Sequence, residues 1–173
     1  MNLSDSRTLD ADVTTVWAAL LDKDVLRQCV PGCQEMTGSP EDGFEAVVVQ
    51  KVGPVKATFK GQVTLSEMNE PVSLRIAGEG KGGPAGFAKG GADVRLESHS
   101  GQTILHYDVE AKVGGKLAQL GSRIIDGFAK KMADQFFDNF QQAVAPPAPA
   151  DEATDEVAEG ETPKKGWFRK LVG

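Results

Sequence analysis

The sequence predicts an α+β fold in which a curved antiparallel sheet wraps around one long C-terminal helix. Between residues 44 and 113, apolar and polar residues alternate in successive runs that are separated by Gly, Pro and Asn turns. This period of two is typical of strands with one buried face. Residues 117–144 instead carry apolar side chains at helical spacing. Only this segment is long enough to cover the apolar face of the sheet.

The first elements are a weak strand over residues 3–9 and two short helices. Asp10 or Asp12 can cap the first helix and Asp22 the second, because an aspartate side chain accepts hydrogen bonds from free N–H groups at a helix start. Pro31-Gly32 ends the second helix. The apolar residues expected to pack are Val13, Val16, Trp17 and Leu20 in the first helix, and Val25, Leu26 and Cys29 in the second.

The meander that follows is expected to be antiparallel, because its strands are joined by short turns. Gly114-Gly115 ends the last strand, and the long helix follows. A sheet that grips one helix in this way is a helix-grip fold. The alternating runs cover residues 44–52, 55–66, 72–79, 92–97 and 105–113.

The facing surfaces of the long helix and the sheet carry small residues. Gly121 and Gly127 interrupt the helix, each at a cost of about 1 kcal/mol relative to alanine. Small facing residues leave either close packing or a cavity, and both outcomes are open. We expect a cavity, because a sheet curved around one helix leaves interior space. The small residues on the apolar face of the sheet are Ala46, Ala57, Ala92 and Ala111.

The segment 78–91 holds seven of the 20 glycines. Gly78, Gly80 and Gly83 match G-x-G-x-x-G, but a strand follows them where a dinucleotide site needs a helix. The segment is therefore expected to be a long, mobile hairpin at the mouth of the pocket. Phe87 is either a gate or docking contact there, or part of a plain flexible hairpin.

Composition and charge exclude several function classes. The net charge of −6 argues against non-specific nucleic-acid binding, which needs a basic face. No secretory signal and no run of 18 apolar residues is present, so a cytoplasmic protein with at most peripheral membrane contact is expected. Cys29 and Cys33 have neither redox nor zinc spacing and are interpreted as structural thiols.

No catalytic residues and no metal site are expected. The histidines His99 and His106 and the strand carboxylates fall on the polar face of the sheet, where solvated side chains are the ordinary interpretation. The carboxylates are Asp93, Glu97, Asp108 and Glu110.

The chain divides into a domain over residues 1–145, a flexible Pro/acidic linker over 146–163, and a basic amphipathic tip over 164–173. Each basic residue near an anionic leaflet contributes about 1 kcal/mol, so the tip is predicted to associate reversibly with membranes. A solubilising tail and a protein-binding tip are the alternatives. The residues of the predicted tip are Lys164, Lys165, Trp167, Phe168, Arg169, Lys170 and Leu171.

Several motifs together resemble the family of the carbon monoxide dehydrogenase G subunit. They include the helix opening over residues 10–20, Cys29-Val30-Pro31-Gly32-Cys33, and Lys51-Val52-Gly53-Pro54-Val55-Lys56 with Phe59-Lys60-Gly61. The remaining motifs are Gly86-Phe87-Ala88-Lys89-Gly90, the segment 113–123 and the segment 133–137. The resemblance covers roughly residues 1–143.

The resemblance implies a START-like (SRPBCC) helix-grip fold with an apolar, lipid-binding pocket. It implies a non-catalytic accessory protein that links a molybdenum-containing CO dehydrogenase or related hydroxylase to the inner face of the cell membrane. It also implies membrane recruitment and quinone binding, with no other cofactor. The alternatives are an assembly or maturation factor without a ligand, and a cyclase-like or hydrolytic enzyme of the same superfold.

On this interpretation, the helix and the sheet each supply one wall of the pocket. Tyr107 either donates a hydrogen bond to a quinone carbonyl or is a core aromatic residue. The expected pocket residues are Leu117, Leu120, Ile124, Phe128 and Met132 from the helix, Phe59, Val94 and Tyr107 from the sheet, and Phe87 from the hairpin.

Overall fold

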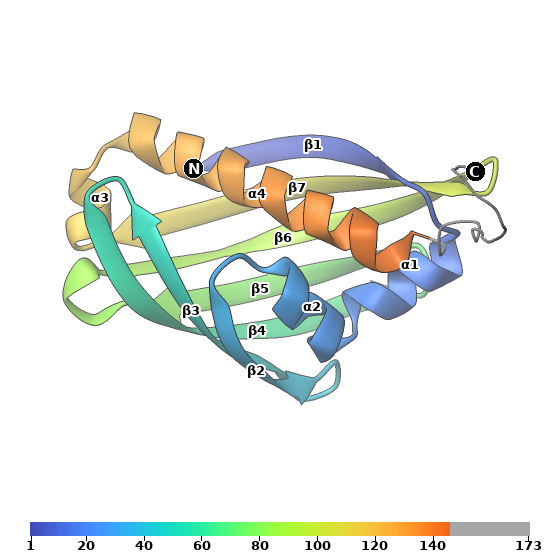
Figure 1. The fold of residues 1–173 in the computed structure, drawn as a ribbon, viewed down its shortest axis with the longest axis horizontal. Coiled ribbons are helices and arrows are strands. Elements are labelled where there is room, and N and C mark those ends of the chain that lie inside the picture. The colour runs from blue at the N-terminus through green and yellow to red at the C-terminus, as the bar shows by residue number, and fades with distance from the viewer. Residues whose placement is uncertain (146–173) are drawn as a thin grey trace, which may run out of the picture.

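A computed structural model describes residues 1–145. Seven antiparallel strands form one sheet in the order β1-β7-β6-β5-β4-β3-β2 and curve around the long helix α4 (Figure 1). The predicted helix-grip fold is confirmed. The elements are β1 Asn2–Leu9, α1 Val13–Leu20, α2 Lys23–Cys29, β2 Cys33–Ser39, β3 Gly43–Val52, β4 Val55–Asn69, β5 Ser73–Lys81, a 3-10 turn η1 Gly83–Ala85, β6 Phe87–His99, β7 Gln102–Gly114, α3 Lys116–Gln119 and α4 Ser122–Val144.

The two short helices begin where the capping signals predict. The Asp12 side chain accepts a hydrogen bond of 2.8 Å from the Thr15 N–H at the start of α1. The Asp22 side chain accepts one of 2.9 Å from the Asp24 N–H at the start of α2. Both carboxylates satisfy backbone donors that no residue of the helix itself can pair.

Strand β2 was missed from the sequence. It pairs with β3 at the edge of the sheet, and its register shifts between Cys33 and Glu35. An edge strand of this kind lacks a regular buried face, so its sequence shows no clear alternation.

The prediction of a long glycine hairpin is wrong. Strands β5 and β6 stay paired to their ends, with Gly78 opposite Gly90 and Gly80 opposite Ala88. Only η1 and its flanking residues form the connection. The glycines are therefore mainly strand residues whose backbones pair across the sheet.

The prediction of one continuous helix from Leu117 to Val144 is also wrong. The chain breaks at Gly121, which has φ 90°, and this divides the segment into α3 and α4. A positive φ of this kind cannot continue a right-handed helix and is readily adopted by glycine. Because of the break, Leu117 and Leu120 do not continue the helical spacing of the residues of α4.

The main core lies between the sheet, α1 and the C-terminal half of α4. Tyr107 of β7 stacks on Phe137 of α4 with ring centroids 5.0 Å apart, and Phe140 is completely buried beside them. A second, smaller cluster forms around Val52, Leu117 and Ile125, at the α3 end of the sheet. Large aromatic side chains thus fill the half of the interior around Tyr107, Phe137 and Phe140, while the half around Val52, Leu117 and Ile125 holds a smaller core cluster.

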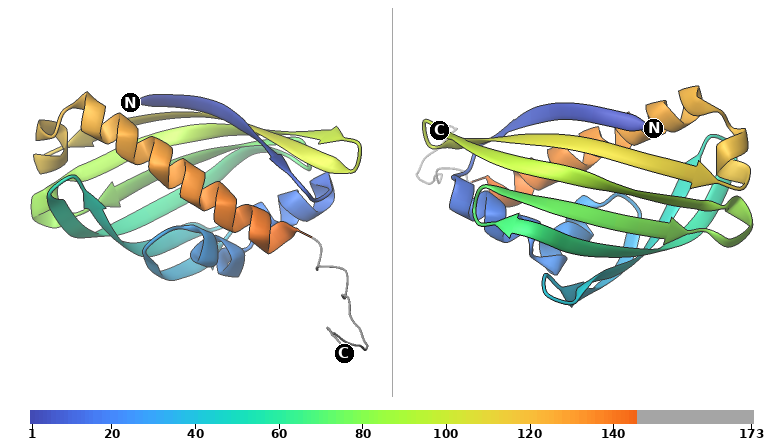
Figure 2. Two further views of the ribbon diagram at one scale, coloured as in Figure 1. Left: turned by 45° about the horizontal axis from the view of Figure 1, so that its top comes forward. Right: turned by 180° about the vertical axis from the view of Figure 1, so that it is seen from behind.

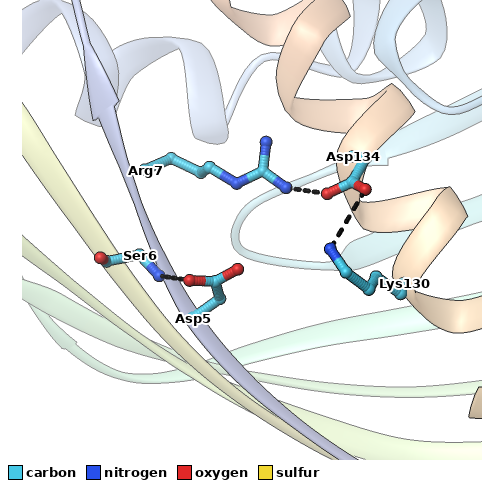
Figure 3. A network of polar contacts seen from close by, with 5 residues as sticks. All are labelled: Asp5, Ser6, Arg7, Lys130 and Asp134. Atoms are coloured by element: carbon cyan, nitrogen blue, oxygen red, sulfur yellow. Dashed lines mark hydrogen bonds and ion pairs between the residues drawn. The ribbon is translucent and has the colours of Figure 1, made fainter.

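A polar network joins β1 to α4 on the rim of the main core (Figure 3). Arg7 donates a hydrogen bond to Asp134, which also accepts one of 3.3 Å from Lys130. The Arg7 guanidinium lies 5.4 Å from the ring centroid of Phe137. Partial burial would raise the pKa of Asp134, but the hydrogen bonds from Lys130 and Arg7 outweigh it and lower that pKa.

Candidate functional site

A partly open cavity of about 270 Å³ lies between the sheet and the α3 end of α4. One wall comes from the helices and the other from the inner face of strands β3 to β7, with Met1 beside them. The cavity lies in the half of the interior that holds the smaller core cluster, where the side chains leave space between them. The lining residues are Met1, Val48, Gln50, Val52, Phe59, Gly80, Ala88, Ala111, Val113, Leu117, Ile125, Phe128, Ala129 and Met132.

Small residues on adjacent strands open the space. Gly80 lies opposite Ala88, and Ala88 lies opposite Val113. A Cβ atom placed on Gly80 would meet no heavy atom within 4 Å. Since Gly80 lines the cavity, a side chain at this position would project into the cavity.

The wall that faces the cavity is apolar. Gln50 is the one polar residue in the lining, and its side-chain N–H₂ donates to the carbonyl of Pro31. Ligand pockets typically enclose about 300–1,000 Å³. The site therefore suits an apolar ring or a short apolar segment, and a longer chain would have to extend beyond it.

Four of the predicted pocket residues line the cavity: Phe59, Leu117, Phe128 and Met132. Leu120 packs against the same core cluster without lining the cavity. Ile124 was predicted for the wall but is 41% exposed, and Ile125, 8% exposed, lines the cavity in its place. Ile124 and Ile125 belong to the same helix, α4, and the face that lines the cavity is centred on Ile125, Phe128, Ala129 and Met132, so Ile124 lies at its edge.

Val94 and Tyr107 were also predicted for the wall, and neither lines the cavity. They lie opposite each other on β6 and β7, within the main core. The bulky residues of α4, including Phe137, fill the interior at that level. Burial raises the pKa of the Tyr107 hydroxyl, as expected of a core tyrosine.

Phe87 does not stand at the mouth of the cavity. Its neighbour Ala88 faces the cavity, and successive strand residues point to opposite faces, so Phe87 lies on the outer face of the sheet. Its side chain is 42% exposed. Its ring covers Gly114, where a Cβ atom would come within 2.3 Å of the ring. Phe87 therefore stabilises a cross-strand contact outside the cavity.

Several wall residues were missed, among them Gly80, Ala88 and Ile125. The strand period places residues two apart on one face, and this signal could have located Ala88. Met1 is held in place because its amino group donates a hydrogen bond of 2.9 Å to the Ala111 carbonyl. No sequence pattern indicates that contact.

Three of the four carboxylates of the polar face contact a basic side chain on the outer surface, and the fourth, Asp108, accepts a hydrogen bond from the Ser4 hydroxyl. Arg75 bridges Asp93 and Glu110 at 3.0 and 2.8 Å, and His106 contacts Glu97 at 2.9 Å. Within residues 1–145, no group of three or more His, Cys, Asp or Glu side chains could hold a metal ion. Cys29 and Cys33 are free thiols.

The predicted linker, 146–163, and the predicted tip, 164–173, lie outside the described residues. In the described part of the chain, no helix combines the length and apolar character needed to cross a bilayer.

Comparisons with known proteins agree with this architecture. The chain is similar to a conserved protein from Geobacillus kaustophilus, with 29% identity and a TM-score of 0.78 over 83% of this chain and 95% of the other. It is also similar in fold to a START superfamily protein from Mycobacterium smegmatis, with 14% identity and a TM-score of 0.63 over 83% and 96% of the two chains.

A protein from Arthrobacter aurescens gives 16% identity and a TM-score of 0.60 over 87% of this chain and 90% of the other. The comparison with curated proteins found no match. The family described as the G subunit of carbon monoxide dehydrogenase (CoxG) matches residues 6–145, which is nearly all of the described chain. With its START-like helix-grip fold, the chain therefore belongs to the CoxG family.

Proposed function

We propose that this protein is a non-catalytic accessory protein whose cavity binds an apolar ligand, a respiratory quinone. Through that ligand it would connect a molybdenum-containing CO dehydrogenase or a related hydroxylase to the cell membrane. The observation that carries the proposal is the apolar cavity between α4 and the sheet. Membership of the CoxG family supplies the class of partner enzyme.

The walls of the cavity suit an aromatic or quinonoid ring. Phe59 and Phe128 supply aromatic surface from opposite sides, and Met132 supplies an adaptable thioether. Because Gln50 is the one polar side chain of the lining and one of its N–H groups is bonded to Pro31, affinity would come mainly from buried apolar area. A prenyl chain longer than the cavity would extend from its open side.

The basic tip supports the membrane part of the proposal. Lys164, Lys165, Arg169 and Lys170 surround Trp167 and Phe168 in the sequence. Four basic residues give about 4 kcal/mol of attraction to an anionic leaflet, which supports reversible attachment to the inner face of the membrane.

Native mass spectrometry of the purified full chain, followed by extraction with organic solvent, tests the ligand. We expect a bound mass that the extract identifies as a quinone. The variant Gly80→Leu should lose this mass, because its side chain would fill the cavity. Gly127→Leu is the matched control, since Gly127 is an exposed residue of α4 whose Cβ also meets open space.

An empty cavity in the wild-type protein, with no uptake of added short-chain ubiquinone, would refute ligand binding. Partner enzyme produced without this protein tests the maturation alternative. If that enzyme is inactive even with a soluble dye as electron acceptor, assembly of the partner is the function instead.

A further inference from the structure

The basic residues of the domain are concentrated at the end that holds the cavity. The segments 46–66, 80–92 and 111–125 contain eight of the 15 Lys and Arg residues within 1–145, and none of the 19 Asp and Glu residues. The β3–β4 turn, the β5–β6 turn and the β7–α3 junction, which lie in these segments, meet at one end of the molecule (Figure 2). An acidic protein therefore has one basic end.

Lysines lie directly opposite one another across this part of the sheet. The register pairs Lys51 with Lys56, Lys60 with Lys81, and Lys89 with Lys112. We call these six residues and Lys116 the lysine patch; all seven are exposed. Like charges at opposed positions destabilise a sheet, so three such pairs oppose folding.

Carboxylates border the patch without pairing with it: Glu35, Glu45 and Glu79 share a groove with Lys60 and Lys81, and Glu110 shares one with Lys89 and Lys112. Within residues 1–145, none of the seven lysines forms an ion pair. Glu79 lies opposite Lys89 in the register and forms no ion pair with it. Lys56, Lys60, Lys81 and Lys116 line an open groove of about 790 Å³ whose wall has no acidic residue.

The patch and the cavity lie on opposite sides of the same strands. Phe59 and Gly80 line the cavity, while the next residues, Lys60 and Lys81, line the groove. In the same way, Leu117 faces the cavity and Lys116 faces the groove. The exposed turn residues Pro54 and Pro84 border the groove.

We propose that the lysine patch is a docking surface for an anionic lipid leaflet, which it holds against the cavity end of the domain. The charge is complementary to the leaflet, and the patch consists of lysine alone. Lysine is depleted in protein–protein interfaces, whereas it attracts anionic lipids as well as arginine does. The surface is therefore better suited to a lipid headgroup layer than to a protein partner.

This docking surface is separate from the basic tip. Helix α4 starts at the cavity end and runs to the opposite end of the domain, where the described chain finishes (Figure 1). An attachment beyond residue 145 does not by itself turn the cavity end toward the membrane. The inference rests on the membrane part of the proposed function and deepens it, and it holds whether or not the cavity contains a quinone.

Co-sedimentation of the full chain with vesicles of equal parts phosphatidylcholine and phosphatidylglycerol tests the proposal. The partition coefficient of the variant Lys56→Glu/Lys81→Glu/Lys116→Glu should be lower than that of wild type by more than about tenfold. The reason is that each lysine near the leaflet raises the partition coefficient about fivefold. The control Lys23→Glu/Arg95→Glu/Lys131→Glu has the same net charge, and its three positions are exposed and free of ion pairs within the described residues. The control should stay close to wild type.

A second variant excludes misfolding. Lys56→Gln/Lys81→Gln/Lys116→Gln relieves like-charge pairs, so it should keep the wild-type denaturation midpoint or raise it while vesicle binding falls. Equal losses in the patch variant and the control, or wild-type binding by the patch variant, would overturn the proposal. If the patch variant binds vesicles as wild type does but no longer binds an acidic protein partner, the lysine patch is a protein interface and the lipid proposal is overturned. Quinone content, measured separately by mass spectrometry, distinguishes these results from failure of the proposed function.

Discussion

The ring of Phe59 lies against the backbone of Gly82, so closely that a Cβ atom on Gly82 would come within 2.4 Å of the ring carbon Cε1. Phe59 is part of the cavity wall. The glycine at the end of β5 therefore allows the aromatic ring to lie where it closes one side of the cavity. Two glycines near this end of β5 have different roles: Gly80, within the strand, leaves space in the cavity, and Gly82, directly after it, accommodates the ring.

We expect Gly82→Ala to displace the Phe59 ring and to destabilise the protein by about 1–3 kcal/mol, as in other overpacked sites. Binding of the apolar dye N-phenyl-1-naphthylamine should change at the same time, since the wall moves. Gly80→Ala is the control, because its added methyl group meets open space. Urea denaturation and dye titration measure both effects, and equal stabilities of the two variants would contradict the assignment.

Adjacent isoleucines test which face of α4 lines the cavity. Ile125 is 8% exposed and Ile124 is 41% exposed. Ile125→Ala should cost about 2–5 kcal/mol, the usual cost of a buried large-to-small change, whereas Ile124→Ala should cost much less. Urea denaturation compares them directly. A larger loss for Ile124→Ala would show that Ile124, as predicted from the sequence, and not Ile125, faces the interior.

The order of most elements and the helix caps could be predicted because they depend on local patterns, whereas β2 and the break between α3 and α4 were missed. The capping roles of Asp12 and Asp22 depend only on the first turn of the helix that follows each of them. The alternation of residues 55–65 depends only on one face of the strand being buried. The cavity wall was harder to predict, because it depends on the φ of Gly121 and on which strand residues share a level with α4. Tyr107 and Phe128 both belong to apolar faces, but only the three-dimensional packing places one in a filled core and the other beside a space.

Tyr107→Phe tests the core assignment of the single tyrosine. The side chain stacks on Phe137 and does not line the cavity. Removal of the hydroxyl should leave the affinity for short-chain ubiquinone unchanged, as measured by isothermal titration calorimetry. A loss of affinity of tenfold or more, without a change in the denaturation midpoint, would show that Tyr107 contacts the ligand.

The network of Arg7, Asp134 and Lys130 predicts a dependence of stability on pH. The pKa of Asp134 is lowered in the folded protein from its ordinary value of 3.8. A carboxylate with a lowered pKa stabilises the fold above the unfolded-state pKa, and this contribution is lost as the pH falls through the folded-state value. Asp134→Asn should therefore be less stable than wild type at neutral pH, and the difference should shrink in acid.

Urea denaturation at neutral pH and below the ordinary aspartate pKa measures this difference. Asp138→Asn is the matched control, because Asp138 is exposed on the same helix and forms no ion pair within the described residues. The same loss in both variants would mean that the network does not stabilise the contact between β1 and α4.

Phe128→Trp tests the cavity itself. Phe128 lines the cavity from α4 and is partly buried, so a larger indole should occupy ligand space. Because the added atoms enter a space and not a packed core, stability should change by less than about 1.5 kcal/mol, while uptake of short-chain ubiquinone should fall at least tenfold. Phe87→Trp makes the same chemical change on the outer face of the sheet, where the ring covers Gly114, and should bind as wild type does. Calorimetry with the two variants compares a change inside the cavity with the same change outside it. If both bind ubiquinone equally well, Phe128 does not contact the ligand, and the ligand lies somewhere other than the space between α4 and the sheet.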